Sequence, residues 1–428
     1  MPEAPSDLLH ELKWRGLLHQ ATSEDDLRAH LAEPRRIYCG FDPTAPSLTI
    51  GNLVPIMLLR HAQRAGHTPV VIMGGATGLI GDPSGKSEER RLLTPAQVDE
   101  HIAAQRRIFE RTLDLTGERA AVILNNHDWI GRLSFIEALR DVGKHFSVNA
   151  MMQKDSVRDR LHNREQGISY TEFSYQILQS YDFLRLRWDQ KVTVQCGGSD
   201  QWGNIIGGVD LVRRVLREEV FGFTAPLVTK ADGGKFGKSE AGAVWLTADR
   251  TSPYAFHQFW FNCDDRDVGR YLRMFTFLTL EEIEALEADH AANPGARSAH
   301  RALANHVTEF VHGEAERLRA EQAAQALFSG DVAGLDAATL DEVFAGAPSS
   351  EHPLGRLAGE GVGMVDLLVE TGLAKSKREA REFLQNGSVS VNGDRVGPDD
   401  RLRESSLMHK TVALLRRGKK TWHVTRWR

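Results

Sequence analysis

The chain has 428 residues, of which 41% are hydrophobic and 26% are charged, a composition typical of globular proteins with two or three domains. Its three cysteines (Cys39, Cys196, Cys263) are too few for a disulfide framework and lack zinc-ligand spacing, so we expect a reducing, cytoplasmic setting. No run of about 18 apolar residues occurs and the acidic start lacks a signal-peptide pattern, so we expect no membrane segment.

Charge is distributed unevenly along the chain. The net charge is −5, but residues 361–428 contain 14 Lys and Arg against 8 Asp and Glu, a net of +6 that leaves −11 for the first 360 residues. A basic C-terminal segment on an acidic body favours a nucleic-acid contact at that end. Charge alone is equally compatible with a merely soluble tail.

Residues 36–232 predict an α/β domain, because short apolar runs alternate there with longer amphipathic runs. The short runs typical of buried parallel strands are 36–39, 70–73, 121–124, 192–195 and 226–229. Such alternation implies right-handed crossovers and a parallel sheet with its ligand loops at the carboxyl ends of the strands. We therefore expect a Rossmann-like catalytic domain whose site lies near Tyr38, Gly74, Gln195 and Thr229.

Two short segments, 41–52 and 235–239, point to a phosphate site. The first joins a predicted strand to an apolar helical run at 53–64. In the second, Lys235 and Lys238 flank a glycine that lets the backbone bend. Two ammonium groups facing a helix N-terminus are suited to hold a triphosphate while one bond breaks. Each segment alone is more typical of a solvated turn, so the hypothesis depends on their joint occurrence.

A glycine-rich segment, 74–86, follows the second predicted strand and invites comparison with a P-loop. A P-loop requires a glycine five residues before Gly85, where this chain has Ile80. Lys86 also begins no obvious helix. A P-loop kinase is therefore not favoured.

The helix predicted at 171–181 carries a polar face. Tyr175, Gln179 and Asp182 lie at positions i, i+4 and i+7 and project from one side, while residues such as Ile177 define a separate apolar side. The polar face could be a solvated stripe or one wall of a binding site.

From residue 252 onward the pattern is helical and then mixed. Helices are predicted at 253–260, 264–275, 280–293, 298–312 and 315–327. Residues 328–362 are rich in Gly, Ala, Pro and Ser and predict a linker with little helix of its own. After it, an alternating strand reaches an Asn-Gly turn at Asn392. We expect four parts: the catalytic domain 1–232, a loop and helical domain 233–327, a linker 328–362, and an α+β module 363–428.

The segments 38–44, 74–86, 141–149, 170–175 and 197–204 resemble, in order and spacing, those of bacterial tyrosyl-tRNA synthetases, which are class I aminoacyl-tRNA synthetases. The agreement extends from near the N-terminus to the last twenty residues. The segments 41–52 and 235–239 correspond to the first and second signature sequences of the class I family. The first signature departs from the family, which usually has two histidines where this chain has Thr49 and Asn52. The resemblance implies a tyrosine–tRNA ligase that activates L-tyrosine with ATP and then transfers tyrosyl to the 3′ end of tRNA(Tyr). The helical domain resembles the family's anticodon-side domain, and the C-terminal module resembles a small RNA-binding module.

The same resemblance implies the site residues. Those for tyrosine are Tyr38 and Asp182 at the phenol, Asp82, Tyr175 and Gln179 at the ammonium group, and Gln201 near the carboxylate. Those for the activation chemistry are Thr44, Thr49, Asn52, Lys86, Arg90, Lys235, Lys238 and Ser239. Those for ATP are Cys39, Gly40, Asp42, Gly51, Gly198, Asp200, Leu227, Val228 and again Lys238. Those for tRNA phosphates are Lys375, Lys377, Arg378, Arg416, Arg417, Lys419 and Lys420.

The resemblance further implies ATP as a substrate with Mg²⁺, with no metal or organic cofactor held by the protein itself. It implies a homodimer through an insertion near 129–152, whose apolar residues include Phe135, Leu139, Phe146 and Val148. The alternative hypothesis is a synthetase-like RNA-binding protein with impaired activation chemistry, which Thr49 favours.

Overall fold

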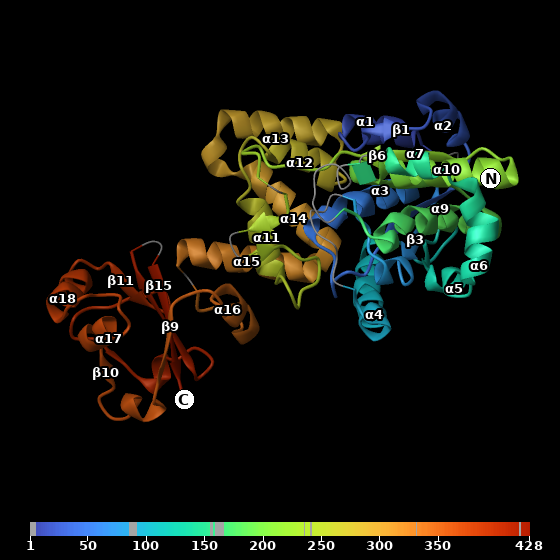
Figure 1. Cartoon of the computed structure of the whole chain (residues 1–428). Helices are drawn as coiled ribbons and strands as arrows, with labels where there is room; N and C mark the ends of the chain where they lie inside the picture. The colour runs from blue at the N-terminus through green and yellow to red at the C-terminus, as the bar shows by residue number, and fades with distance from the viewer. Residues whose placement is uncertain are drawn as a thin grey trace. The chain divides into compact units, whose positions relative to one another are not determined.

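The computed structural model describes residues 6–84, 92–154, 157–158, 167–234, 236–239, 242–330, 332–418 and 421–428, and Figure 1 labels its elements. The chain forms two compact units, Met1–Thr251 with Phe259–Gly313, and Ser252–Gln258 with Glu314–Arg428. None of the described helices is both long and apolar enough to cross a membrane.

A mostly parallel sheet forms the centre of the first unit. Over the described residues its strand order is β1-β6-β5-β2-β3-β4, and all pairs are parallel except β1 with β6. The strands are β1 (Gln20–Ala21), β2 (Arg36–Phe41), β3 (Thr68–Met73), β4 (Val122–Asn125), β5 (Val192–Gly198) and β6 (Phe221–Ala225). This sheet confirms the predicted Rossmann-like class.

Helices cover the sheet and explain why its strands are apolar runs. Helix α3 (Leu53–Arg64) packs on β2, β3, β5 and β6, whereas α9 (Tyr170–Gln190) and α10 (Trp202–Leu216) pack on β5. Side chains of α9 and α10 form one hydrophobic cluster with Tyr38 of β2. Because side chains alternate along a strand, Tyr38 faces α9 while Cys39 faces the opposite side.

Shorter elements surround this framework. The helices are α1 (Leu8–Trp14), α2 (Glu24–His30), α4 (Pro95–Thr112), α5 (His127–Ile130), α6 (Phe135–Glu137) and α7 (Val148–Met152). The 3₁₀ turns are η1 (Ile50–Asn52), η2 (Thr77–Leu79), η4 (Gly143–His145) and η5 (Ser199–Gln201), and η3 (Ala138–Val142) is a π-helical turn.

The strand predicted at 226–229 is wrong in position. The strand is β6 (Phe221–Ala225), and the four predicted residues form the loop that follows it. Pro226 explains the shift, because a proline has no N–H to donate to the sheet and so ends the strand.

Helices complete the first unit beyond residue 259. They are α12 (Val268–Phe275), α13 (Leu280–Ala292) and α14 (Ser298–His312), while α11 (Pro253–Phe261) spans residues of both units. The helix predicted to start at residue 264 begins only at Val268, because the Asp264 carboxylate accepts the backbone N–H of Arg266 and forms a turn. The aromatic rings of Trp260, Tyr271 and Phe275 lie within 6 Å of the Phe236 ring.

The second unit contains a sheet with the strand order β12-β11-β14-β15-β9. Its strands are β9 (Ser349–His352), β11 (Val389–Val391), β12 (Asp394–Arg395), β14 (Val412–Arg417) and β15 (Thr421–Trp427), and β10 (Val362–Gly363) pairs with β13 (Arg401–Leu402). Its helices are α15 (Glu314–Ser329), α16 (Ala337–Val343), α17 (Met364–Glu370) and α18 (Lys377–Gln385). The predicted Asn392 turn joins β11 to β12, and positive φ values at Asn392 and Gly393 fit a tight hairpin.

The segment predicted as a linker, 328–362, differs from the prediction. It contains α16 and also β9, which pairs in parallel with β15 at the edge of the sheet. Leu340 of α16 is buried against Val412, Leu414 and Val424. The apolar side chains of this segment therefore pack into the unit, and the boundary expected at residue 363 separates β9 from the rest of its sheet.

Arg15 ties the N-terminal helix to the end of α12. Its side chain is 3% exposed, and its guanidinium donates to the carbonyl oxygens of Arg273, Thr276 and Leu278 at 2.8–3.0 Å. These carbonyls lie in or just after the last turn of α12, where intrahelical donors are absent.

Arg15→Met should lower the free energy of unfolding by about 3 kcal/mol or more, because it leaves these buried acceptors unpaired. Arg106→Met is the matched control, since the Arg106 side chain is 51% exposed and pairs with Glu110 on the same helix. This variant should cost about 0–1 kcal/mol. Urea unfolding measures both. Equal losses in the two variants would contradict this role of Arg15.

Candidate active site

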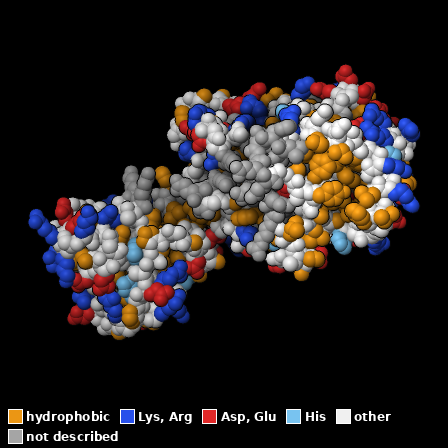
Figure 2. Space-filling model, in the orientation of Figure 1, with side chains coloured by type: hydrophobic (Ala, Val, Ile, Leu, Met, Phe, Trp, Pro, Cys, Tyr) orange, Lys and Arg blue, Asp and Glu red, His pale blue; other side chains and the backbone are white. Residues whose placement is uncertain are grey.

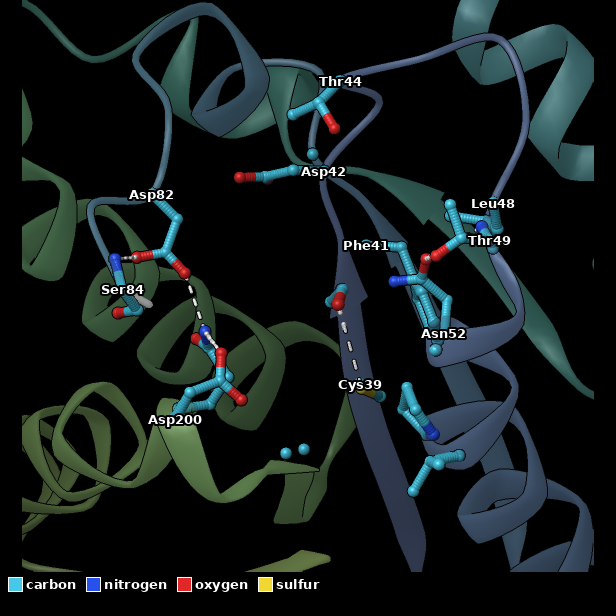
Figure 3. A pocket seen from close by; sticks show the side chains of 18 of the residues that line it. Cys39, Phe41, Asp42, Thr44, Leu48, Thr49, Asn52, Asp82, Ser84 and Asp200 are labelled. Carbon is cyan, nitrogen blue, oxygen red and sulfur yellow. Dashed lines mark hydrogen bonds between the residues drawn. The ribbon is translucent and has the colours of Figure 1, made fainter. Parts of the chain in front are cut away.

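A cavity of about 700 Å³ opens at the carboxyl ends of the parallel strands, as the sheet topology predicts. Figure 3 shows side chains from separate loops converging on it. The predicted residues that line it are Tyr38, Cys39, Gly40, Asp42, Thr44, Thr49, Gly51, Asn52, Asp82, Tyr175, Gln179, Asp182, Gly198, Asp200, Gln201, Leu227 and Val228. The predicted residues Lys86, Arg90 and Lys235 lie outside the described residues, and the side chains of Lys238 and Ser239 are not described.

A buried polar slot forms the inner end of the cavity. Asp182, which is 4% exposed, accepts hydrogen bonds from Asn126 Nδ2 at 2.9 Å and Trp129 Nε1 at 2.7 Å. Burial raises the pKa of the Asp182 carboxyl to about 7, although these two hydrogen bonds lower it. Tyr38 Oη has no hydrogen-bond partner among the described residues, and burial followed by the charge of Asp182 raises the pKa of Tyr38 well above its ordinary value. A ligand hydroxyl would satisfy this slot.

Asp42 anchors the wall beside the slot. Its two oxygens accept from Thr77 Oγ1 at 2.7 Å and Tyr175 Oη at 2.9 Å, so it joins the loops after β2 and β3 to α9. Gly74 must lack a side chain here, because a Cβ would lie 2.2 Å from an oxygen of Asp42. Helix α4 secures the loop after β2 through Gln105, whose Nε2 donates to the Ala45 carbonyl at 2.8 Å.

A second polar group lies on the other side of the cavity. Gln201 Nε2 donates to Asp82 at 2.7 Å and to Asp200 at 2.9 Å, and the other oxygen of Asp82 accepts from the Ser84 backbone (Figure 3). Gln179 Oε1 is buried without a hydrogen-bond partner among the described residues. Two carboxylates and an amide oxygen facing one cavity favour a positively charged ligand group.

The segment 41–52 lies against Gly237 of the segment 235–239 and against the residues 244–246 that follow it, although these parts are far apart in sequence. Backbone hydrogen bonds join Ile50 N to Val244 O and Leu246 N to Leu48 O, and Thr49 forms a bridge with Trp245. Gly237, with φ of +86°, sits so close that a Cβ would lie 2.8 Å from the Ile50 side chain. Residues of both segments, among them Thr49 and Phe236, line the same cavity.

Thr49 and Asn52 form a capping box at the start of η1. The backbone N–H and the hydroxyl of Thr49 both donate to Asn52 Oδ1, at 3.0 and 3.1 Å. The Thr49 hydroxyl is therefore engaged within the turn. Because Asn52 Oδ1 accepts both bonds, Nδ2 is the atom of Asn52 oriented to donate elsewhere.

Sequence reasoning missed Asn126, Trp129 and Thr77. Asn126 donates to Thr77 Oγ1 at 3.0 Å and accepts from Ala76 N at 2.8 Å, and it lies directly after the end of β4. A polar residue after a predicted parallel strand was the available signal for Asn126. Nothing local marks Trp129, because its role depends on reaching Asp182.

The predicted tRNA residues lie in different settings of the second unit. Lys375, Lys377 and Arg378 are exposed near the start of α18, although Lys377 pairs with Asp366 at 2.7 Å. Arg417 donates to the Leu373 carbonyl and lies over the Phe383 ring, and Arg416 lies over the Trp422 ring. Lys419 and Lys420 lie outside the described residues.

The predicted interface segment carries exposed apolar side chains, and Figure 2 shows a hydrophobic area on the first unit. Phe135 (66%), Ile136 (67%), Leu139 (44%), Val148 (58%) and Met152 (43%) are exposed on α6, η3 and α7. Phe146 instead packs partly against the α9 and α10 cluster.

Comparison with known proteins identifies the family. A family model described as class I tRNA synthetases (W and Y) matches residues 30–329, and a tyrosine–tRNA ligase SYY-like C-terminal domain matches residues 340–425. The chain is 52% identical to the tyrosine–tRNA ligase of Bacillus caldotenax over 98% of this chain and 100% of that protein. It belongs to the tyrosine–tRNA ligase family.

Other tyrosine–tRNA ligases agree with this assignment. That of Aliivibrio fischeri is 48% identical over 99% of this chain and its whole length. A C-terminally truncated mitochondrial tyrosyl-tRNA synthetase of Aspergillus nidulans aligns in structure with a TM-score of 0.67 and 30% identity, covering 76% of this chain and 94% of that one. The alternative of an RNA-binding protein with impaired activation receives no support from these relatives.

The raised pKa of Asp182 predicts a pH dependence of stability. The folded pKa of about 7 exceeds the ordinary value of 3.8, so the folded state holds a proton that the unfolded state loses between pH 4 and 7. Stability therefore falls as pH rises through this window, by up to about 4 kcal/mol. Asp182→Asn removes this dependence, at the constant cost of one lost acceptor.

Urea unfolding at several pH values measures this effect as the stability of Asp182→Asn minus that of the parent. The difference should rise from pH 4 to pH 7. Asp189→Asn, whose side chain is 46% exposed on the same helix, is the matched control and should run parallel to the parent. A flat difference for Asp182→Asn would contradict the burial effect.

Proposed function

We propose that the cavity binds L-tyrosine and ATP side by side and joins them as tyrosyl-adenylate. The observation that carries this proposal is the buried slot, where Tyr38 Oη lacks a hydrogen-bond partner among the described residues and is close enough to Asp182 to feel its charge. A phenol hydroxyl can donate to Asp182 and accept from Tyr38. Phenylalanine has the same ring but would leave both groups desolvated and unpaired, which is costly.

The other end of tyrosine fits the second polar group. Asp82, Tyr175 and Gln179 supply the oxygens for an ammonium group, and Gln201 lies beside Asp82 at 2.7 Å, near the place proposed for the carboxylate. Held at both ends, the amino acid would present its carboxylate to ATP.

The reaction needs no protein nucleophile. A tyrosine carboxylate oxygen forms a bond to the α-phosphorus of ATP, and the bond from that phosphorus to the bridging oxygen breaks, releasing pyrophosphate. The carboxylate is already ionised at neutral pH, so the protein contributes position and charge stabilisation.

The nucleotide is proposed to lie along the first signature. Gly40 and Gly51 leave room there, because a Cβ on Gly40 would meet nothing within 4 Å and one on Gly51 only Thr49 at 3.7 Å. Cys39, Asp42, Gly198 and Asp200 border the proposed ribose position, and Leu227 and Val228 that of adenine. Asn52 Nδ2 is the proposed donor from the capping box.

The phosphate contacts are proposed from the family motif. Lys86, Arg90, Lys235, Lys238, Ser239 and Thr44 would hold the phosphates, and Mg²⁺ would arrive with ATP as part of the substrate. The contact between Gly237 and Ile50 supports this placement, because it holds the lysine-bearing loop beside the start of α3.

The second half-reaction transfers tyrosyl to the terminal adenosine of tRNA(Tyr). The exposed cations Lys375, Lys377 and Arg378 are proposed to contact tRNA phosphates, which carry no sequence information by themselves. Arg416 and Arg417 have contacts within the unit and would act partly by shaping that surface.

We also propose a homodimer through α6 and α7 and a cytoplasmic location. The exposed apolar side chains of Phe135, Ile136 and Val148 support the dimer, because a monomer would leave them in water.

Tyr38→Phe should reduce the preference for tyrosine over phenylalanine by about tenfold, because one hydrogen bond to the phenol is lost. ATP–pyrophosphate exchange measured separately with tyrosine and with phenylalanine gives this preference. Tyrosine-dependent exchange by the parent chain also tests the proposed function itself. Tyr181→Phe, outside the cavity lining on the same helix as Asp182, is the matched control. An unchanged preference for tyrosine over phenylalanine in Tyr38→Phe would refute the proposal that Tyr38 binds the phenol hydroxyl.

Lys375→Glu combined with Arg378→Glu should raise the KM for tRNA by roughly tenfold or more at moderate salt and flatten the salt dependence. Pyrophosphate exchange should stay unchanged, because the first unit holds the cavity. Lys13→Glu, at a position 62% exposed on the first unit, controls for charge alone. Equal KM values for tRNA in the parent, the double variant and Lys13→Glu would argue against tRNA binding at the surface of Lys375 and Arg378.

Ile136→Asp should convert the dimer into a monomer, because it places a charge on the proposed apolar contact. Light scattering at micromolar concentration measures the mass. Leu280→Asp, at a position 37% exposed on α13, should leave the mass unchanged. A parent chain that is already monomeric would refute the dimer.

A further inference from the structure

Three potential metal ligands gather in the helical part of the first unit, away from the cavity. Asp265 lies in the turn before α12, His290 in the last turn of α13, and His300 in the first turn of α14. One potential ligand atom from each residue lies within 4.8 Å of the other two. Among the described residues, these three form the group of His, Cys, Asp and Glu side chains that could hold a metal ion. We call it the Asp265–His290–His300 cluster.

The geometry of the cluster is close to that of a coordination sphere. Asp265 Oδ1 lies 3.2 Å from His300 Nε2 and 4.0 Å from His290 Nε2. Ligand atoms about 2.0–2.2 Å from a zinc ion are separated by roughly 3–3.5 Å, so small side-chain rotations would close the site.

The surroundings of the two imidazoles support a ligand role. The His300 side chain is fully buried with Asp265 Oδ1 at 3.2 Å from its Nε2, and His290 Nδ1 is buried without a hydrogen-bond partner among the described residues. Buried polar atoms are normally satisfied, so each such atom calls for a cause. Imidazole nitrogens are the commonest protein ligands of transition metals.

We propose that the Asp265–His290–His300 cluster binds one divalent transition-metal ion, with Zn²⁺ the favoured species. Two imidazoles and one carboxylate suit zinc and its neighbours, whereas Mg²⁺ and Ca²⁺ prefer oxygen ligands alone. Asp265 is 57% exposed, so water can complete the coordination from the solvent side.

Arg297 is the cation that competes for Asp265. Its Nη1 lies 3.9 Å from Asp265 Oδ1, but Nη2 donates to the Phe261 carbonyl at 2.6 Å and the guanidinium lies over the Phe261 ring. These contacts hold Arg297 to the side of the cluster. A free lone pair on Asp265 therefore remains for the ion.

A bound ion would fasten α13 and α14 to the turn before α12. That turn also supports the loop that leads to the second signature, because Asp267 accepts from Ala231 N at 2.9 Å. The ion would therefore stabilise the base of this loop without touching the cavity.

The test uses the full chain after treatment with EDTA and dialysis. Isothermal titration with ZnCl₂ should show a single ion bound per chain, with MgCl₂ giving no such signal, and the melting temperature should rise by a few degrees. Asp265→Asn and His290→Gln, both at partly exposed positions, should each weaken binding about tenfold or more. His10→Gln, at an exposed position on α1, should bind like the parent.

CoCl₂ identifies the ligands by absorption spectroscopy. Visible bands without an intense thiolate charge-transfer band in the near ultraviolet would support nitrogen and oxygen ligation. A thiolate band would overturn the ligand set and point to Cys263, two residues before Asp265. Absence of zinc binding by the parent, or equal affinity in Asp265→Asn, His290→Gln and His10→Gln, would also overturn the proposal.

Discussion

The buried carboxylate of Asp182 is the constraint on which the arrangement of the cavity depends. A carboxylate in an apolar interior must receive hydrogen bonds, and its own helix offers none to its oxygens. The donors come from Asn126 and Trp129, which follow the edge strand β4. These two hydrogen bonds therefore hold the loop after β4 against α9.

The same hydrogen bonds continue outward and link every loop around the slot. Asn126 also binds Thr77, Thr77 binds Asp42, and Asp42 receives Tyr175. The chain of bonds starts and ends on α9, so the helix that is proposed to bind the phenol also positions the segment 41–52. Buried networks of this kind rigidify a site when each member is satisfied. Beside this network, Tyr38 Oη and Gln179 Oε1 have no hydrogen-bond partner among the described residues, so a ligand could satisfy them.

Trp129 connects the slot to a different part of the molecule. It donates to Asp182 from α5, and the next helices along the chain are α6 and α7, which carry the exposed apolar side chains. If two copies meet through that surface, the segment that supports Asp182 becomes part of the assembly. The proposed dimer would then also order a wall of the tyrosine slot.

The sequence by itself determined the periodic elements and the side chains they present. The bounds of α3 and α14 match the predicted ranges because their apolar spacing and flanking residues are local signals. The spacing of Tyr175, Gln179 and Asp182 placed all three on the cavity side of α9, since helix geometry alone sets that face. The order of the motifs along the chain likewise identified the family.

Only the tertiary structure decided which distant groups satisfy one another. The partnership of Trp129 with Asp182 joins residues 53 positions apart, and β9 joins β15 across more than 70 positions, so no local pattern reports either. The linker expected at 328–362 packs into the second unit because its few apolar side chains find partners in β14 and β15. Asp265, His290 and His300 come together for the same reason. Burial and pairing belong to the folded chain as a whole, whereas periodicity belongs to each segment.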